Sequence, residues 1–152
     1  MGGPYTMSKH AVEAYGDTLA LELDRFGVAV SLIEPGNYKS SISESLAGRM
    51  ESRGLDTKGS LYAEDWKNRM DRPTDRAQYK EPDEVSAAAV HFMTSDAPLP
   101  RYMVVPDANE AEITIRRAMQ ELVELNEWQA YKYDRDALVK MLDEALAPPA
   151  EE

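Results

Sequence analysis

The sequence predicts an α/β fold in which helices flank a parallel β-sheet. A long stretch with helical spacing of its apolar residues covers 6–26, and a short β-branched run at 28–33 follows directly after Gly27. A short apolar run without alternation is typical of a strand buried on both faces, as in a parallel sheet. A second short strand is expected at 101–105. A long helix, a tight turn and a buried strand make half of a βαβ unit, the building block of α/β folds.

The helix predicted over 6–26 has a broad apolar surface. Its polar positions form only a narrow stripe, at Glu13, Asp17 and Asp24, and Gly27 is well placed to end the helix. An apolar arc of this width exceeds what a surface helix needs, so we expect this helix to be covered on two sides. The apolar positions fall in two rows, Val12, Tyr15, Leu19, Leu23 and Phe26, and Met7, Ala11, Ala14, Thr18 and Leu21.

A polar, charge-dense segment at 40–80 follows the first predicted strand, which ends in strong turn residues at 34–37. Short helices are expected at 42–52 and 63–70, with glycines and a proline interrupting the rest. Loops of this length in compact domains are often functional. The segment is therefore either a solvated insertion or a lid over a site.

Three further helices and one strand complete the predicted order of elements. Pro82 and the acidic residues around it favour a helix start. The elements are a helix over 81–95, the strand over 101–105, a helix from about 110 to 127 and a last helix capped by Asp134, before a tail at 148–152.

These elements include too few strands for an independent parallel sheet. The run at 28–33 has the character of a central strand, and a parallel sheet of only two strands cannot cover such a strand. We therefore expect the chain to be the C-terminal part of a larger α/β domain. The alternative is that it folds only by dimerising through its exposed apolar faces.

Composition excludes several classes of function. The chain has 152 residues and a net charge of −11, which disfavours nucleic acid and anionic membranes as partners because phosphate groups would repel it. The absence of cysteine excludes disulfides, iron–sulfur clusters, thiolate zinc and a cysteine nucleophile. His10 and His91 are isolated, so no metal site is expected. Without a membrane-length apolar run or a signal peptide, the expected location is cytoplasmic.

The most informative residues are Tyr5 and Lys9, which are four positions apart and share one face of a helix. A nearby ammonium group favours the phenolate form of a tyrosine, which makes the tyrosine a usable acid and base near neutral pH. The alternative, favoured by spacing alone, is that Tyr5 packs and Lys9 is solvated. The context of this pair decides between the two readings.

Three motifs supply that context, in the order Tyr5-Thr6-Met7-Ser8-Lys9-His10-Ala11, Glu34-Pro35-Gly36-Asn37-Tyr38-Lys39-Ser40 and Glu81-Pro82-Asp83-Glu84-Val85 through Ser95-Asp96. Together they resemble the active-site helix, the Pro-Gly turn and the helix after the substrate loop of the short-chain dehydrogenase/reductase family. The resemblance covers about residues 1–106. It implies the C-terminal part of a Rossmann-like, doubly wound parallel sheet, followed by a helical extension at 107–147.

The resemblance also implies roles for individual residues. Tyr5 would be the general acid or base for an alcohol or carbonyl substrate, and Lys9 would assist it and hydrogen-bond the ribose of NAD or NADP. The Pro35-Gly36 turn would bring its backbone close to the nicotinamide. The cofactor contacts would include Ser40, at a position where the family usually has threonine, and the backbone N–H of Tyr38.

The resemblance further implies a homo-oligomer that associates through the helix at 6–26. The residues expected to line a substrate pocket, or else to pack locally, are Tyr62, Trp66 and Met70 in the 40–80 loop.

The sequence departs from the family in three respects. It contains no glycine-rich cofactor loop, no units for the adenosine half of the cofactor and no catalytic serine ahead of Tyr5, because only Met1-Gly2-Gly3-Pro4 precede it. We therefore expect a fragment of a longer reading frame with little or no activity alone. The alternative function is a non-catalytic helical association module derived from this family.

Overall fold

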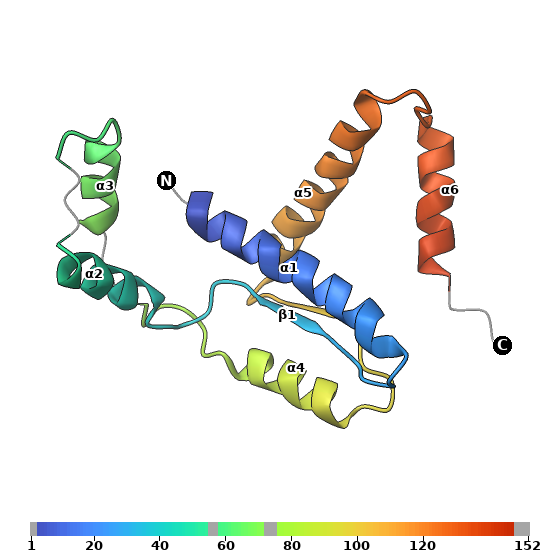
Figure 1. Ribbon diagram of the computed structural model, residues 1–152, viewed down its shortest axis with the longest axis horizontal. Helices are drawn as coiled ribbons and strands as arrows, with labels where there is room; N and C mark the ends of the chain where they lie inside the picture. The colour runs from blue at the N-terminus through green and yellow to red at the C-terminus, as the bar shows by residue number, and fades with distance from the viewer. Residues whose placement is uncertain (1–2, 55–57, 72–75, 148–152) are drawn as a thin grey trace. The chain divides into compact units, whose positions relative to one another are not determined.

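The computed structural model describes residues 3–54, 58–71 and 76–147, with the side chains of Ala47 and Met70 left out. The chain divides into two compact units, Met1–Asp107 and Ala108–Glu152, which are described separately. The first unit contains four helices and two strands in the described residues, and the second contains two helices (Figure 1). In chain order, these elements are α1 (Gly3–Asp24), β1 (Leu32–Pro35), α2 (Ile42–Ser52), α3 (Ala63–Met70), α4 (Asp83–Thr94), β2 (Arg101–Val104), α5 (Ala108–Glu127) and α6 (Arg135–Leu146).

The two strands form a parallel sheet, as the sequence predicts. Leu32 pairs with Arg101, and the register continues to Pro35 opposite Val104. The first strand begins at Leu32 rather than at Val28, so its predicted start was wrong. Pairing begins only where β2 begins, and Val28 is 48% exposed. The result is an α/β unit with a short two-stranded parallel sheet in the described residues.

Helices lie on both faces of this sheet, with α1 on one side and α4 on the other (Figure 1). The alternation of the strand explains which side chains meet which helix. Arg101 reaches carboxylates on α1, whereas the next residue, Tyr102, meets His91 on α4 with 2.8 Å between the hydroxyl and Nδ1. Each strand is therefore contacted from both sides, as a parallel sheet requires.

Close packing of α1 on β1 depends on Gly16, a buried residue in the middle of the helix. A Cβ atom at this position would lie 2.8 Å from Cδ2 of Leu32. The helix ends as predicted, with Gly27 at a φ of 67°. Its N–H donates to the Asp24 carbonyl at 2.8 Å and that of Val28 to the Leu23 carbonyl at 3.4 Å, which is the Schellman pattern.

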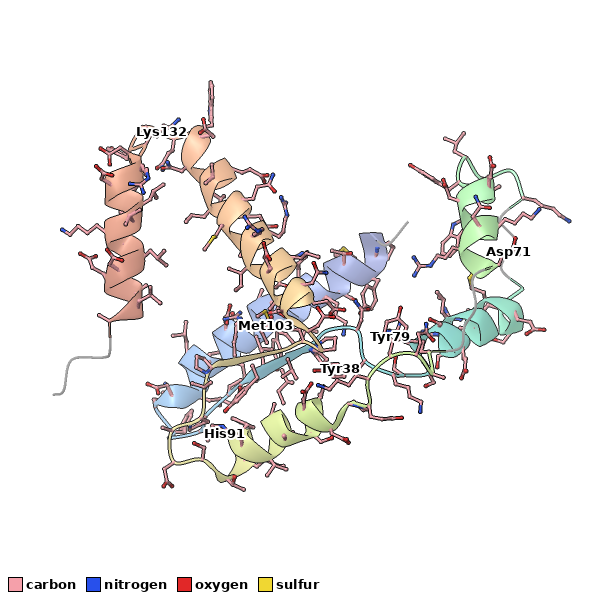
Figure 2. All side chains as sticks on the ribbon, turned by 180° about the vertical axis from the view of Figure 1, so that it is seen from behind. Tyr38, Asp71, Tyr79, His91, Met103 and Lys132 are labelled. Atoms are coloured by element: carbon pink, nitrogen blue, oxygen red, sulfur yellow. The ribbon has the colours of Figure 1, made fainter. Side chains whose placement is uncertain are left out.

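Few side chains of the first unit are enclosed. Among the described residues Tyr38 is the buried apolar one, at 4% exposure (Figure 2). Much of the broad apolar arc of α1 is exposed, because β1 covers only the side near Gly16. The exposed large apolar residues of this helix are Tyr5, Met7, Val12, Tyr15 and Leu21.

The second unit consists of α5 and α6, joined by a connection that Asn126 fixes. This residue is 8% exposed, its amide donates to the Tyr133 carbonyl at 2.9 Å, and its Oδ1 accepts from the Tyr133 N–H at 3.0 Å. Asp134 caps α6 as predicted, because its carboxylate accepts from the Ala137 N–H at 2.9 Å. Within the described part of the chain, no helix combines the length and the apolar character that crossing a membrane requires.

Candidate active site

Tyr5 and Lys9 lie one turn apart near the start of α1, as their spacing predicts. The Lys9 ammonium lies 5.5 Å from the centroid of the Tyr5 ring. Tyr5 is 56% exposed as a residue. The helix therefore places an ammonium group over the face of an exposed tyrosine ring.

The turn after β1 is held by backbone hydrogen bonds. The Gly36 N–H donates to the Val104 carbonyl at 2.8 Å, which extends the sheet by one bond beyond Pro35. The Tyr38 N–H donates to the Gly36 carbonyl at 3.0 Å. A cofactor contact through the Tyr38 N–H would therefore compete with a bond that already exists within the turn, whereas Ser40 is exposed.

Side chains at and just before the start of α4 contact the residues that follow this turn. The Tyr38 hydroxyl donates to Glu84 Oε2 at 2.5 Å, and the Lys39 ammonium lies 2.5 Å from Glu81 Oε1. Glu84 also pairs with Lys80. Hydrogen bonds from Lys80 and then from Tyr38 lower the pKa of Glu84 below its ordinary value, since both favour the carboxylate.

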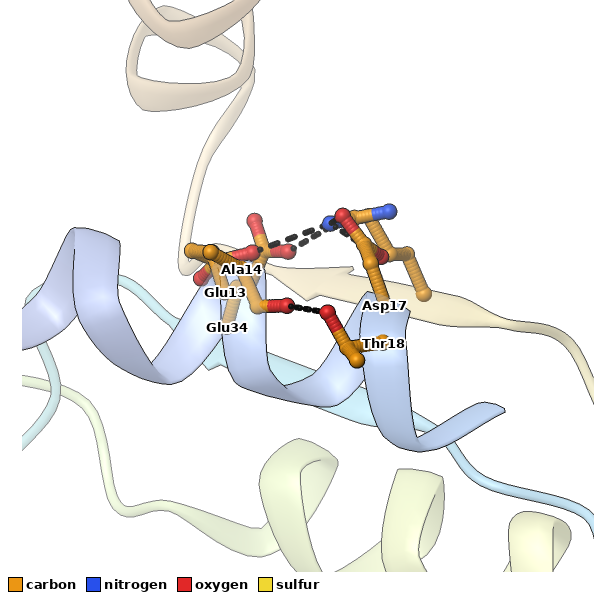
Figure 3. A network of polar contacts seen from close by, with 6 residues as sticks. Glu13, Ala14, Asp17, Thr18 and Glu34 are labelled. Atoms are coloured by element: carbon orange, nitrogen blue, oxygen red, sulfur yellow. Dashed lines mark hydrogen bonds and ion pairs between the residues drawn. The ribbon is translucent and has the colours of Figure 1, made fainter. Parts of the chain in front are cut away.

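A second polar network connects α1 with both strands (Figure 3). The Arg101 guanidinium lies 2.9 Å from a carboxylate oxygen of Asp17, 3.3 Å from Glu13 Oε2 and 3.2 Å from Glu34 Oε1. The last contact is an ion pair without hydrogen-bond geometry, and this Glu34 oxygen is buried. The network joins α1 to Glu34, two residues before Gly36, and to Arg101 at the start of β2.

Burial and charge shift the acidity of this network. Burial raises the pKa of Glu34 above its ordinary value, and the adjacent Glu13 carboxylate raises it further, while Arg101 acts in the opposite direction. The hydrogen bond to Asp17 raises the pKa of Arg101, so the guanidinium stays charged. Burial and the neighbouring Glu13 carboxylate therefore favour the protonated form of Glu34 more than exposure to water would.

The residues predicted to line a substrate pocket lie on and before α3. Tyr62 precedes the helix and is 57% exposed, and Trp66 follows one turn later and is partly buried. The side chain of Met70 lies outside the described residues. The role of all three in a substrate pocket stays a prediction.

The structure thus brings Tyr5 and Lys9 together, and joins Tyr38 and Lys39 to the start of α4. Sequence reasoning did not identify Glu84 or Arg101 as contributors to these two polar networks. The contact of Glu84 with Tyr38 and the contacts of Arg101 with α1 join residues far apart in the chain, so spacing carries no signal for them. No group of histidine, aspartate or glutamate residues suited to a metal ion occurs in the described ranges.

Several proteins with known names are similar to this chain. Short-chain dehydrogenase/reductase family 9C member 7 from Mus musculus is 56% identical over 52 residues, which are 33% of this chain and 17% of that protein. The uncharacterized oxidoreductase YusZ from Bacillus subtilis is 52% identical over 48 residues, which are 31% of this chain and 17% of the relative.

A longer match is the NADPH-dependent 3-dehydrocapnine reductase from Ornithobacterium rhinotracheale, at 37% identity over 108 residues. These residues are 70% of this chain and 36% of that protein. The chain thus spans well under half the length of these relatives. No family profile and no solved structure matches it. The similarity confirms the resemblance seen in the motifs, and the chain is a relative of the short-chain dehydrogenases/reductases.

Proposed function

We propose that this chain carries the proton-transfer residues and the nicotinamide side of the cofactor site of an NAD(P)-dependent oxidoreductase that interconverts an alcohol and a carbonyl. The observation that carries this proposal is the pairing of Tyr5 with Lys9 at an accessible helix start, in a relative of oxidoreductases. The fold is proposed to be the C-terminal part of a Rossmann-like sheet, supported by the parallel strands with a helix on each face.

The residues present fit a nicotinamide cofactor in their chemistry. Lys9 supplies a cation for ribose hydroxyls, and Ser40 supplies an exposed hydroxyl close to the turn. The Pro35-Gly36 backbone is fixed by its bond to β2. Such a cofactor, NAD or NADP, supplies or accepts the hydride when bound.

The chain's own residues handle the proton. The Tyr5 hydroxyl would protonate the carbonyl oxygen during reduction and accept the alcohol proton during oxidation. Lys9 would favour the phenolate formed when that proton leaves. Because the sequence contains no glycine-rich phosphate loop, we expect the chain of 152 residues to convert substrate slowly or not at all.

A panel of aldehydes and ketones with NADH or NADPH tests the role of Tyr5. We expect turnover near background, with any measurable rate reduced by Tyr5→Phe and retained in Tyr15→Phe. Tyr15 is a suitable control because it is exposed on the same helix. A rate that Tyr5→Phe leaves unchanged would contradict the assignment, and fast Tyr5-dependent turnover would overturn only the expectation of low activity.

A second candidate function is association without catalysis. It is favoured by the exposed apolar residues of α1, among them Met7 at 69% and Leu21 at 81% exposure. A homo-oligomer would bury these side chains. Size-exclusion chromatography with light scattering tests this: we expect an oligomer that Leu21→Asp dissociates, and a wild-type monomer would count against it.

A further inference from the structure

The segment that follows β1 is tied to the residues that precede α4. The Lys39 N–H donates to the Lys80 carbonyl at 2.9 Å, and the Lys39 ammonium pairs with Glu81 at 2.5 Å. These two contacts hold together the two ends of the long polar segment at 40–80. The start and the end of that segment therefore meet beside the turn at residue 36.

Tyr38 lies at this meeting point and is anchored through its side chain. It is 4% exposed, and its hydroxyl donates to Glu84 Oε2 at 2.5 Å. A buried tyrosine whose hydroxyl has a carboxylate acceptor has a defined orientation, because any movement of the ring would break a charge-assisted bond. The side chain therefore fixes the position of its own backbone.

Arg76 holds the same residue from the opposite end of the polar segment. Its Nε and Nη2 atoms lie 3.3 and 3.1 Å from the Tyr38 carbonyl oxygen, so both donate to one acceptor. The guanidinium carbon also lies 3.9 Å from the centroid of the Tyr79 ring, which orients the planar group (Figure 2 labels Tyr38 and Tyr79). An arginine stacked in this way loses little further freedom when it binds a carbonyl.

These contacts form one continuous chain of hydrogen bonds through the turn. Val104 accepts from the Gly36 N–H, Gly36 accepts from the Tyr38 N–H, and Tyr38 accepts from Arg76. The backbone of residues 36–38 is thus held by β2 on one side and by the end of the polar segment on the other. These three successive hydrogen bonds restrict the backbone conformation of residues 36–38 more than the conformational preferences of those residues alone would.

We propose that Arg76 and Tyr38 are positioning residues that hold the Gly36–Tyr38 turn in the conformation that receives the nicotinamide. The cofactor part of this inference rests on the proposed function, whereas the restraint on the turn does not. Because Arg76 belongs to the 40–80 segment expected to contact substrate, it connects that segment mechanically to the cofactor turn.

Residue-resolved hydrogen exchange tests the restraint in the chain as it exists. In Arg76→Met, which removes the donors but keeps the length of the side chain, we expect protection of the Tyr38 and Lys39 amides to fall about tenfold. The Leu32 amide, which donates to the Pro100 carbonyl, serves as an internal reference and should be unchanged. Arg53→Met, at an exposed arginine of the same segment, is the matched control.

The outcomes separate positioning from general stability. Equal loss of protection at Leu32 and Lys39 would show a merely structural role and overturn the proposal, as would unchanged protection in Arg76→Met. Partial recovery of protection is expected in Arg76→Lys, which restores one hydrogen-bond donor.

Titration with nicotinamide mononucleotide tests the functional part of the proposal: binding should be about fivefold weaker in Arg76→Met. Absent binding to wild type would refute the proposed function and leave the exchange result to decide this inference.

Discussion

Gly16 is the position at which the packing of α1 on β1 is most sensitive to one added methyl group. A Cβ at this residue would lie 2.8, 2.9 and 3.0 Å from Cδ2, Cγ and Cδ1 of Leu32, so the whole end of that side chain would have to move. Overpacking of this kind costs about 1–3 kcal/mol, whereas alanine in place of glycine within a helix gains about 1 kcal/mol. We expect Gly16→Ala to lower the free energy of unfolding by up to about 2 kcal/mol.

Urea unfolding followed by far-ultraviolet circular dichroism measures this change. In a Leu32→Ala background the clashing atoms are gone, so Gly16→Ala should there raise the free energy of unfolding by about 1 kcal/mol. Gly48→Ala on α2 is the control for helix propensity, because nothing lies within 4 Å of its added Cβ. If Gly16→Ala has the same effect in both backgrounds, the close contact with Leu32 does not exist.

Three further predictions concern the polar networks. Arg101→Met leaves three carboxylates without their shared cation, and we expect it to lower the free energy of urea unfolding by about 1 kcal/mol. The loss should be smaller at high salt, because the Arg101 side chain is 43% exposed and its ion pairs are screened. An unchanged free energy of unfolding at low salt would contradict the network. Burial raises the pKa of Glu34 in the folded state above its ordinary value of 4.5. The stabilising contribution of the protonated carboxyl group is therefore fully present below pH 4.5, and it is lost as pH rises through the pKa that Glu34 has in the folded state. Glu34→Gln should therefore gain stability relative to wild type between about pH 4 and neutral pH, and a parallel pair of stability curves would refute this. Asn126→Ala removes the hydrogen-bond partners of the Tyr133 backbone, and we expect it to destabilise this connection by about 1–3 kcal/mol. The measurement is hydrogen exchange at the Tyr133 amide, whose protection should be lost. Retained protection would contradict the prediction.

Local signals in the sequence predicted most of the elements. The helices at 42–52 and 63–70, the cap at Asp134 and the helix end at Gly27 all match the structure, because each depends on residues within one or two turns. The first strand was placed too early, since the partner strand, and not the β-branched run, decides where pairing starts.

The candidate site was only partly predictable, because some of its contacts join residues that are far apart in the sequence. The spacing of Tyr5 and Lys9 is local, so the helix brings them together. Arg76 binds a carbonyl 38 residues earlier, and Arg101 reaches a helix more than 80 residues away. Such contacts depend on the register of the sheet and on how the segment at 40–80 returns, which no spacing rule contains.

The central claim is that this chain holds the nicotinamide side of a cofactor site beside Tyr5. The most direct measurement is a titration of the isotope-labelled chain with nicotinamide mononucleotide, followed by amide chemical shifts. We expect saturable shifts at Lys9, Gly36 and Ser40 that Lys9→Met weakens and Lys58→Met leaves unchanged. Shifts that do not saturate, or that Lys9→Met leaves as they are, would contradict the claim.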